Sequence, residues 1–149
     1  HIASLTLQGE VQYRLATLGH AELQPAYELL RQAEAKDCEL PYDEPWGWMV
    51  PAGHALGALL LEGGKCTGDM QLVAEAEQVF RRDLGAPWDE SPRARCFVHP
   101  HNPWALGGLV GALEAQQKLV PEELKLALVE AGQTADVGIK AACMCAVRE

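Results

Sequence analysis

The sequence has no long apolar run and few basic residues. Its longest apolar candidate, Ala55 to Leu61, is far shorter than the roughly 18 residues needed to cross a bilayer, so we expect no membrane span. Lysine and arginine total 12 against 21 acidic residues, which gives a formal net charge of −9. Nucleic acids and anionic membranes bind basic surfaces, so this charge argues against both as the main partner.

Catalytic sequence motifs are also missing. The chain contains no Gly-x-x-x-x-Gly-Lys-Ser/Thr, Gly-x-Ser-x-Gly or His-Glu-x-x-His string, so phosphoryl transfer, nucleophilic hydrolysis and zincin chemistry have no basis in the sequence. Its five cysteines form an odd set with irregular spacing, unlike the disulfide frameworks of small secreted domains. We therefore expect a reducing, cytoplasmic environment.

The chain is long and apolar enough for one core. It has 149 residues, 48% of them apolar, and no break in composition that would divide it, so we expect a single domain. It begins at His1 with neither a methionine nor a signal-peptide pattern, which predicts a processed start or a part of a longer chain. Further repeats before His1, or another copy of the chain, are the expected neighbours of its first helix.

Small residues recur with a period of about fifty residues. Three glycines in apolar helical segments are each followed 17 to 19 residues later by an alanine in a second such segment: Gly9 and Ala26, Gly57 and Ala76, Gly108 and Ala127. Small side chains let two helix backbones approach closely. The pattern therefore predicts paired helices that bury their apolar faces against their neighbours, as in a stacked solenoid.

The expected hairpins cover residues 1–40, 46–85 and 102–135. The first joins a helix from Ile2 to about Gly19 to one that starts near Leu23 and ends before Pro41. The expected helices of the second are 50–61, closed by Gly63 and Gly64, and 72–84.

The third hairpin has clear helix starts. Asn102 is the expected N-cap before Pro103, and Pro121 precedes two glutamates that suit a helix N-terminus. The proline-rich stretches 40–49 and 85–102 are expected to be ordered loops. Residues 137–147 are expected to form an extended tail that packs back on the third hairpin or on a neighbouring chain.

Several segments resemble tetratricopeptide repeat proteins of bacterial type, in particular their C-terminal part. The segments that carry the resemblance are Leu40 to Met49, His54 to Glu62, Ala74 to Leu84, Asn102 to Leu106, Ala135 to Val137 and Cys143 to Cys145. The resemblance implies an all-α fold of antiparallel helix pairs in a right-handed superhelix and a role as an interaction scaffold. The period departs from the usual 34 residues, because the chain has longer loops.

In the register of this resemblance, His54 faces a concave groove. The expected groove residues are His54, Tyr42, Glu44, Trp46, Trp48, Tyr13 and Glu10. A histidine beside carboxylates and aromatic rings is suited to holding a polar ligand or to acid–base chemistry. The alternative is that His54 bonds the carboxylates of the loop and fixes the proline-rich segment to the helix.

A second group combines thiols with imidazoles: Cys96, His99, His101, Cys143 and Cys145. Such donors suit zinc or Cu(I), if the Cys-x-Cys tail folds back onto the His-x-His loop. The alternative is that His99 and His101 are solvated turn residues, since a spacing of two differs from the Cys-x-x-Cys pattern of common structural zinc sites.

The sequence therefore favours a non-enzymatic binding module without a cofactor, whose groove holds a peptide, a partner segment or a small ligand. The rival hypothesis is a metalloprotein or metalloenzyme that uses the Cys/His group or the His54 pocket.

Overall fold

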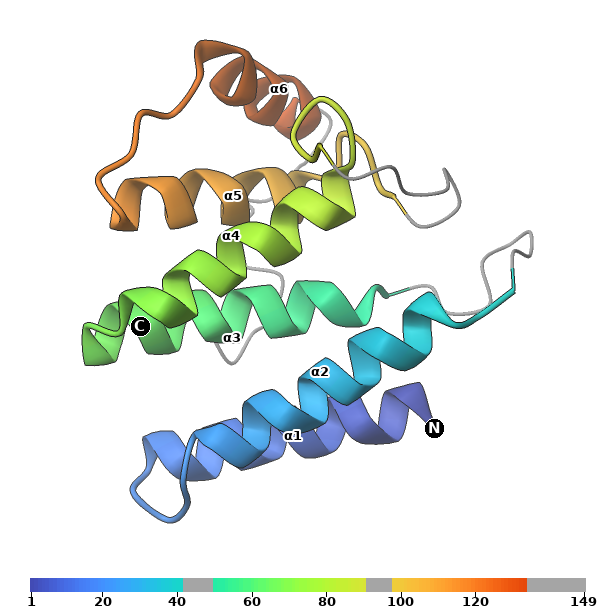
Figure 1. Ribbon diagram of the computed structural model, residues 1–149, viewed down its shortest axis with the longest axis vertical. Helices are drawn as coiled ribbons and strands as arrows, with labels where there is room; N and C mark the ends of the chain where they lie inside the picture. The colour runs from blue at the N-terminus through green and yellow to red at the C-terminus, as the bar shows by residue number, and fades with distance from the viewer. Residues whose placement is uncertain (42–49, 91–97, 134–149) are drawn as a thin grey trace.

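The fold is built from α-helices alone in the residues that the structure describes. The computed structural model describes residues 1–41, 50–90 and 98–133, and these residues contain no strand. The helices are α1 (Ile2–Thr17), α2 (Gln24–Cys38), α3 (Ala52–Thr67), α4 (Met70–Leu84), α5 (Pro103–Ala115) and α6 (Glu122–Gly132). They pack as sequential hairpin pairs, with α1 and α2 at one end of the long axis and α6 at the other (Figure 1).

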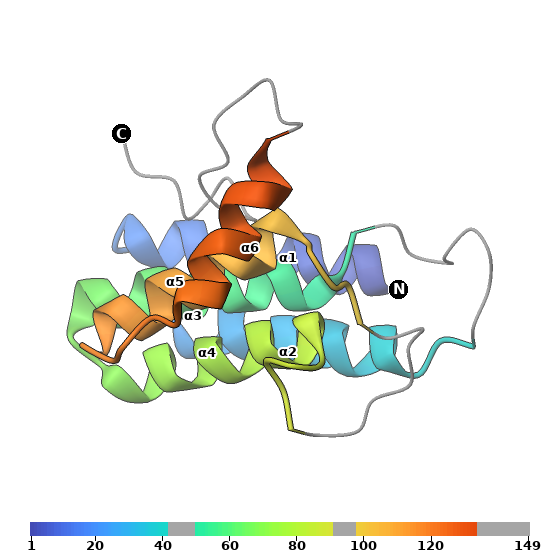
Figure 2. The same cartoon turned by 90° about the horizontal axis from the view of Figure 1, so that it is seen from above.

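The first five helices lie in two layers. Helices α1, α3 and α5 form one layer and α2 and α4 form the other, as both ribbon views show (Figures 1 and 2). Helix α6 runs steeply across the others when the molecule is seen from above (Figure 2). The third hairpin is therefore less regular than the first two.

Two helices begin at side-chain caps. The Asn102 carboxamide oxygen accepts from the backbone N–H groups of Trp104 and Ala105 at 3.0 and 3.1 Å, as the Asn-Pro start predicts. The Asp69 carboxylate accepts from Gln71 N–H at 2.9 Å at the start of α4. Gly68 ends α3 with φ of 75°, a left-handed conformation that glycine adopts readily. Helix α4 begins two residues later.

The helix ends agree with the sequence except in α3. This helix continues through Gly63 and Gly64 to Thr67, whereas the two glycines were expected to close it. Packing explains the difference, because the Tyr27 hydroxyl lies directly against Gly63 and would collide with any side chain there. Glycine at this position serves a close contact between the hairpins, and it does not end the helix.

The first two hairpins use the same small-residue contact. A side chain at Gly9 would meet Leu30 of α2 at 2.7 Å, and one at Gly57 would meet Phe80 of α4 at 2.7 Å. Gly108 of α5 also lies against Phe80, so this ring fills the space between two glycine-bearing helices. The close contact expected for Gly108 is therefore present, although with α4 instead of α6.

The central helix α3 has more buried residues than any other described helix. Every residue from Ala52 to Leu60 is buried, and Leu56, Leu59 and Leu60 are fully so. Neighbouring hairpins are also joined by ion pairs, from Arg31 to Glu75 at 2.6 Å and from Arg82 to Glu34 at 2.9 Å.

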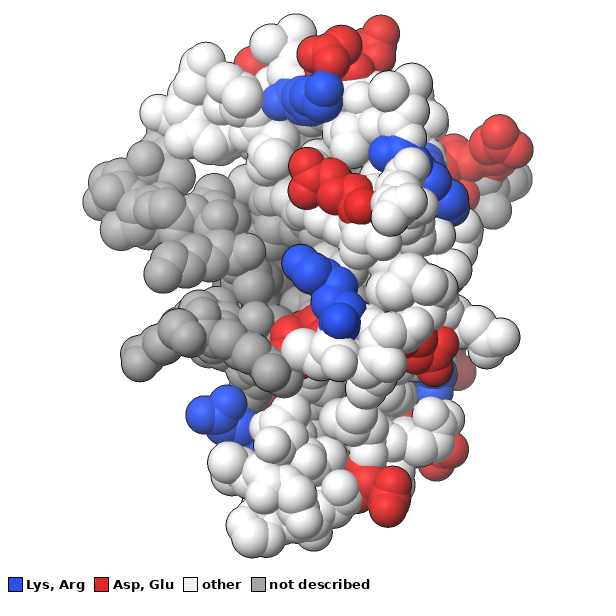
Figure 3. Space-filling model, turned by 90° about the vertical axis from the view of Figure 1, so that its left-hand side faces the viewer, with Lys and Arg blue, Asp and Glu red and all other residues white. Residues whose placement is uncertain are grey.

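The face of the molecule in Figure 3 carries charges of both signs, which agrees with the 12 basic and 21 acidic residues of the sequence. Figure 3 shows one face on which acidic and basic side chains are scattered among uncharged ones, with no continuous basic area. Within the described ranges, none of the helices is both long and apolar enough to cross a membrane.

Candidate functional site

Three side chains from different segments meet at one end of the central helix pair. His54 lies in the first turn of α3, Asp83 lies in the last turn of α4, and His99 lies in the loop between α4 and α5. Because α3 and α4 are antiparallel, the start of one meets the end of the other. This pairing brings His54 and Asp83 together although 29 residues separate them.

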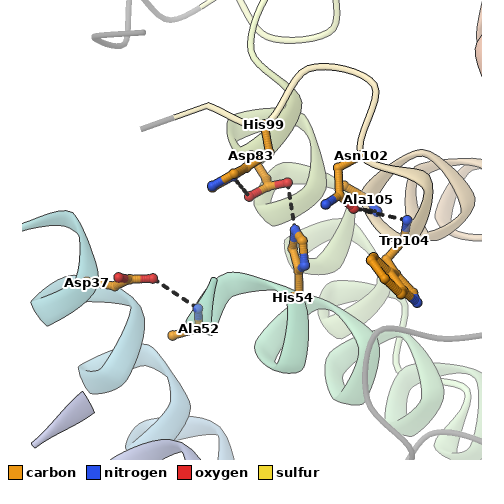
Figure 4. Close-up of polar contacts among 8 residues, drawn as sticks. All are labelled: Asp37, Ala52, His54, Asp83, His99, Asn102, Trp104 and Ala105. Atoms are coloured by element: carbon orange, nitrogen blue, oxygen red, sulfur yellow. Dashed lines mark hydrogen bonds and ion pairs between the residues drawn. The ribbon is translucent and has the colours of Figure 1, made fainter. Parts of the chain in front are cut away.

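The carboxylate of Asp83 lies between the two imidazoles (Figure 4). His54 Nε2 is 2.8 Å from Asp83 Oδ2, and His99 Nδ1 is 2.6 Å from Asp83 Oδ1. The two rings are edge to face, with centroids 5.9 Å apart. Each carboxylate oxygen thus contacts a different imidazole.

The site is largely closed to water. His54 is 4% exposed and Asp83 is 8% exposed, while the His99 side chain keeps 20% of its surface in contact with solvent. The backbone N–H of His99 also donates to the backbone carbonyl of Asp83 at 2.6 Å. His99 is therefore attached to Asp83 through both its main chain and its side chain.

Two carboxylates influence the electrostatics here. Burial alone would raise the pKa of Asp83, but the hydrogen bonds to His54 and His99 outweigh it and lower the pKa below its usual value. Burial raises the pKa of Asp37, whose carboxylate accepts from Ala52 N–H at 3.0 Å at the start of α3. Asp83 and Asp37 are close enough to repel each other, so negative charge accumulates beside two imidazoles.

The arrangement is also the donor set of a metal site. One donor atom from each of His54, Asp83 and His99 lies within 4.8 Å of the others, in a cluster that is the only one of its kind among the described segments. Two imidazole nitrogens and one carboxylate suit zinc and the neighbouring divalent transition metals.

The other predicted groove residues are distributed differently. Tyr13 is 1% exposed, with its hydroxyl near Gly63, and His54 is 4% exposed, so both side chains are buried. Glu10 is half-buried on α1. The groove residues Tyr42, Glu44, Trp46 and Trp48 lie outside the described residues.

The predicted Cys/His group is only partly placed. His99 joins His54 and Asp83, while His101 is exposed, with φ of 67°. Cys96, Cys143 and Cys145, and the predicted tail 137–147, lie outside the described residues.

Sequence reasoning missed Asp83. The available signal was its place on α4, where it continues the buried row of Ala76, Val79 and Phe80 at helical spacing. A carboxylate in such a row needs a polar partner. The sequence does not show that two histidines supply it.

A second feature is an apolar surface on α1. Leu7, Val11, Leu15 and Leu18 follow one another at spacings of four, four and three residues, and they are 62%, 51%, 39% and 59% exposed. We call these four residues, of which Leu18 is the C-cap that follows the helix, the outer face of α1. Such spacing places them in one row along the helix.

The corresponding row on α3 is covered. Gly57 lies 48 residues after Gly9, and the same shift takes Leu7 to Ala55, Val11 to Leu59 and Leu15 to Gly63. All three α3 residues are buried, and Gly63 lies against Tyr27 of α2. The three α3 positions that correspond to Leu7, Val11 and Leu15 are therefore buried, and Tyr27 of the preceding hairpin covers one of them, whereas Cys66, which corresponds to Leu18, is exposed.

Comparison of the chain with protein-family models, with curated proteins and with solved structures finds no match.

Proposed function

We propose that the protein is a helical-hairpin binding scaffold of the tetratricopeptide kind, and that its outer face of α1 binds an amphipathic helix of a partner protein. The observation that carries the proposal is that Leu7, Val11 and Leu15 are exposed on α1, whereas the corresponding residues of α3 are buried, one of them under Tyr27 of the first hairpin. These four neighbouring apolar side chains are 39–62% exposed, and a partner that removes them from water lowers the free energy of the system.

The hairpin stack indicates the shape of the partner. Helix α2 packs on α3 with Tyr27 against Gly63, Glu34 beside Gly53 and Ala33 in one cluster with Ala52, and Asp37 accepts from Ala52 N–H. A helix with a similar row fits the outer face of α1. At the position corresponding to Gly63, however, α1 has Leu15, which leaves no room for a tyrosine. The partner helix therefore has a small residue where α2 has Tyr27.

The outer face of α1 fits this role better than the surroundings of His54. His54 and Tyr13 are 4% and 1% exposed, so a peptide would have to separate packed helices to reach them. The α1 residues need no rearrangement to bind a helix. A rigid and preformed surface loses less conformational entropy on binding.

The test uses a helix of known sequence as the probe. A stapled peptide of residues 24–38 with Tyr27→Ala reproduces the side of α2 that covers α3, and the staple compensates for the marginal stability of a short isolated helix. We expect this peptide to bind the wild-type chain, and the same peptide with Tyr27 retained to bind more weakly. Fluorescence anisotropy of the labelled peptide measures both.

Val11→Lys should weaken binding at least about tenfold, because it places a charge in the middle of the apolar contact. Val50→Lys is the matched control, since Val50 is a similarly exposed valine outside α1, 62% exposed against 51% for Val11. Equal binding by the two variants contradicts the proposal. Light scattering of the chain alone gives a second test. A dimer that Val11→Lys dissociates would contradict the proposal, because a second copy of the chain would then occupy the outer face of α1.

A further inference from the structure

We propose that His54, Asp83 and His99 form a binding site for a divalent transition-metal ion, with zinc as the best-matched ion. His54 Nε2, His99 Nδ1 and the Asp83 carboxylate are the ligands. This site differs from the Cys/His group expected from the sequence, because it uses a carboxylate of α4 and needs no thiol. It is independent of the outer face of α1.

The distances suit a common ion. Zinc binds imidazole nitrogen and carboxylate oxygen at about 2.0–2.2 Å, so two ligand atoms on one ion are at most about 4.3 Å apart. The two nitrogen-to-oxygen distances are 2.8 and 2.6 Å, and all three donors lie within 4.8 Å of one another. Small rotations of the side chains are sufficient to bring them around one ion.

Hydrogen bonds hold the segments that carry the three ligands in place before an ion binds. The α3 helix starts at Ala52, whose N–H is bound by Asp37, and this fixes the turn that carries His54. Main-chain hydrogen bonding joins His99 to Asp83. Because the ligand positions are already ordered, binding needs little further loss of conformational entropy.

The local charge favours a cation. With neutral imidazoles, the carboxylate of Asp83 leaves the cluster at −1, and Asp37 adds a second carboxylate within electrostatic range. The ion replaces the hydrogens that join each ring to Asp83. A proton on a coordinating ring nitrogen then moves to the other nitrogen of that ring or to solvent.

The donor set selects among ions. Two imidazoles and one carboxylate suit zinc, iron, cobalt or nickel better than calcium or magnesium, which prefer oxygen ligands. Three protein ligands leave a further coordination position for water or for a small molecule. The His99 side chain keeps 20% of its surface in contact with solvent, more than Asp83 does, so this ligand is the one that water reaches most easily.

The experiment is isothermal titration calorimetry of the chain with zinc ions. The chain used carries the three substitutions Cys96→Ser, Cys143→Ser and Cys145→Ser, so that the thiols of the predicted Cys/His group do not bind zinc. We expect one zinc ion per chain. Asp83→Asn and His99→Gln should each weaken binding by at least about 100-fold, beyond the 10–100-fold usual for loss of an outer-shell partner.

The exposed histidines His20 and His101 supply matched controls, because His20→Gln and His101→Gln leave the three ligands intact. Circular dichroism checks that every variant is folded. Zinc X-ray absorption of the unsubstituted chain should show two imidazoles and oxygen, which tests the site even if a ligand variant unfolds. Absence of stoichiometric binding, unchanged affinity in folded Asp83→Asn, or a zinc–sulfur shell overturns the proposal.

Discussion

At the scale of single residues, two buried carboxylates of α4 hold neighbouring segments together. Asp83 joins α3 and the segment before α5 through its two histidines. Glu77 is 4% exposed and accepts from Arg81 at 2.8 Å, from Gln116 at 2.8 Å and from Lys118 at 2.7 Å. Both carboxylates are compensated by several donors, which is the condition for burying a charge without large loss of stability.

Glu77→Gln should lower the free energy of unfolding by about 1–3 kcal/mol at neutral pH, because hydrogen bonds with charged partners are lost. Burial opposes ionisation of Glu77, but the bonds from Lys118 and Arg81 outweigh it and lower its pKa. The stabilisation is therefore complete above the unfolded-state pKa of about 4.3 and is lost as the pH falls through the lower folded-state pKa.

Urea unfolding of the wild type and the variant at a series of pH values measures this effect. The difference between them should be constant near neutral pH and should shrink below about pH 4. Glu122→Gln is the control, because Glu122 forms an exposed pair with Lys125 that contributes little. A difference between wild type and Glu77→Gln that persists at low pH would show that the charge of Glu77 is not the cause.

At the scale of elements, helix positions were largely predictable because they follow local rules. Apolar spacing, the Asn102 cap and proline positions predict both ends of α1, α2 and α4 and the start of α5 to within about two residues, the usual uncertainty of helix ends. The end of α3 was not predictable in this way. Gly63 is indistinguishable in sequence from a glycine that stops a helix, and only the position of Tyr27 shows that it serves a contact.

Ala76→Leu tests the predicted close packing of helices. Ala76 of α4 is fully buried in the main core, so three additional carbon atoms should lower the free energy of unfolding by about 1–3 kcal/mol through overpacking. Ala35→Leu is the control, because Ala35 is exposed within α2. Thermal unfolding of both variants measures the difference. Equal stability would show that Ala76 does not mark a tight contact.

At the scale of the whole molecule, the sequence predicts sequential helix pairs, and the described residues have them. The orientation of α6 was not predicted, because the sequence pairs Gly108 with Ala127, whereas the side chain nearest to Gly108 is that of Phe80 of α4. The candidate metal site was predicted only in part, for the reason that His54 and His99 are recognisable in sequence whereas their meeting at Asp83 depends on the antiparallel arrangement of α3 and α4.

The outer face of α1 has a directional consequence. On α3, the C-terminal end of α2 lies at the helix start, since Asp37 bonds Ala52 N–H at 3.0 Å. A shift of 48 residues takes Ala52 to Ser4. A partner helix that binds α1 as α2 binds α3 therefore has its C-terminal end near Ser4, far from Leu18.

The most direct measurement of the proposed binding mode is paramagnetic broadening in nuclear magnetic resonance. A nitroxide is attached to Cys38 of the stapled 24–38 peptide that carries Tyr27→Ala, and amide signals of the chain are recorded with the label oxidised and reduced. The docking proposal predicts strong broadening around Ser4 and little at Leu18. Broadening centred on another helix or on the Leu18 end, or none under saturating peptide, would contradict it.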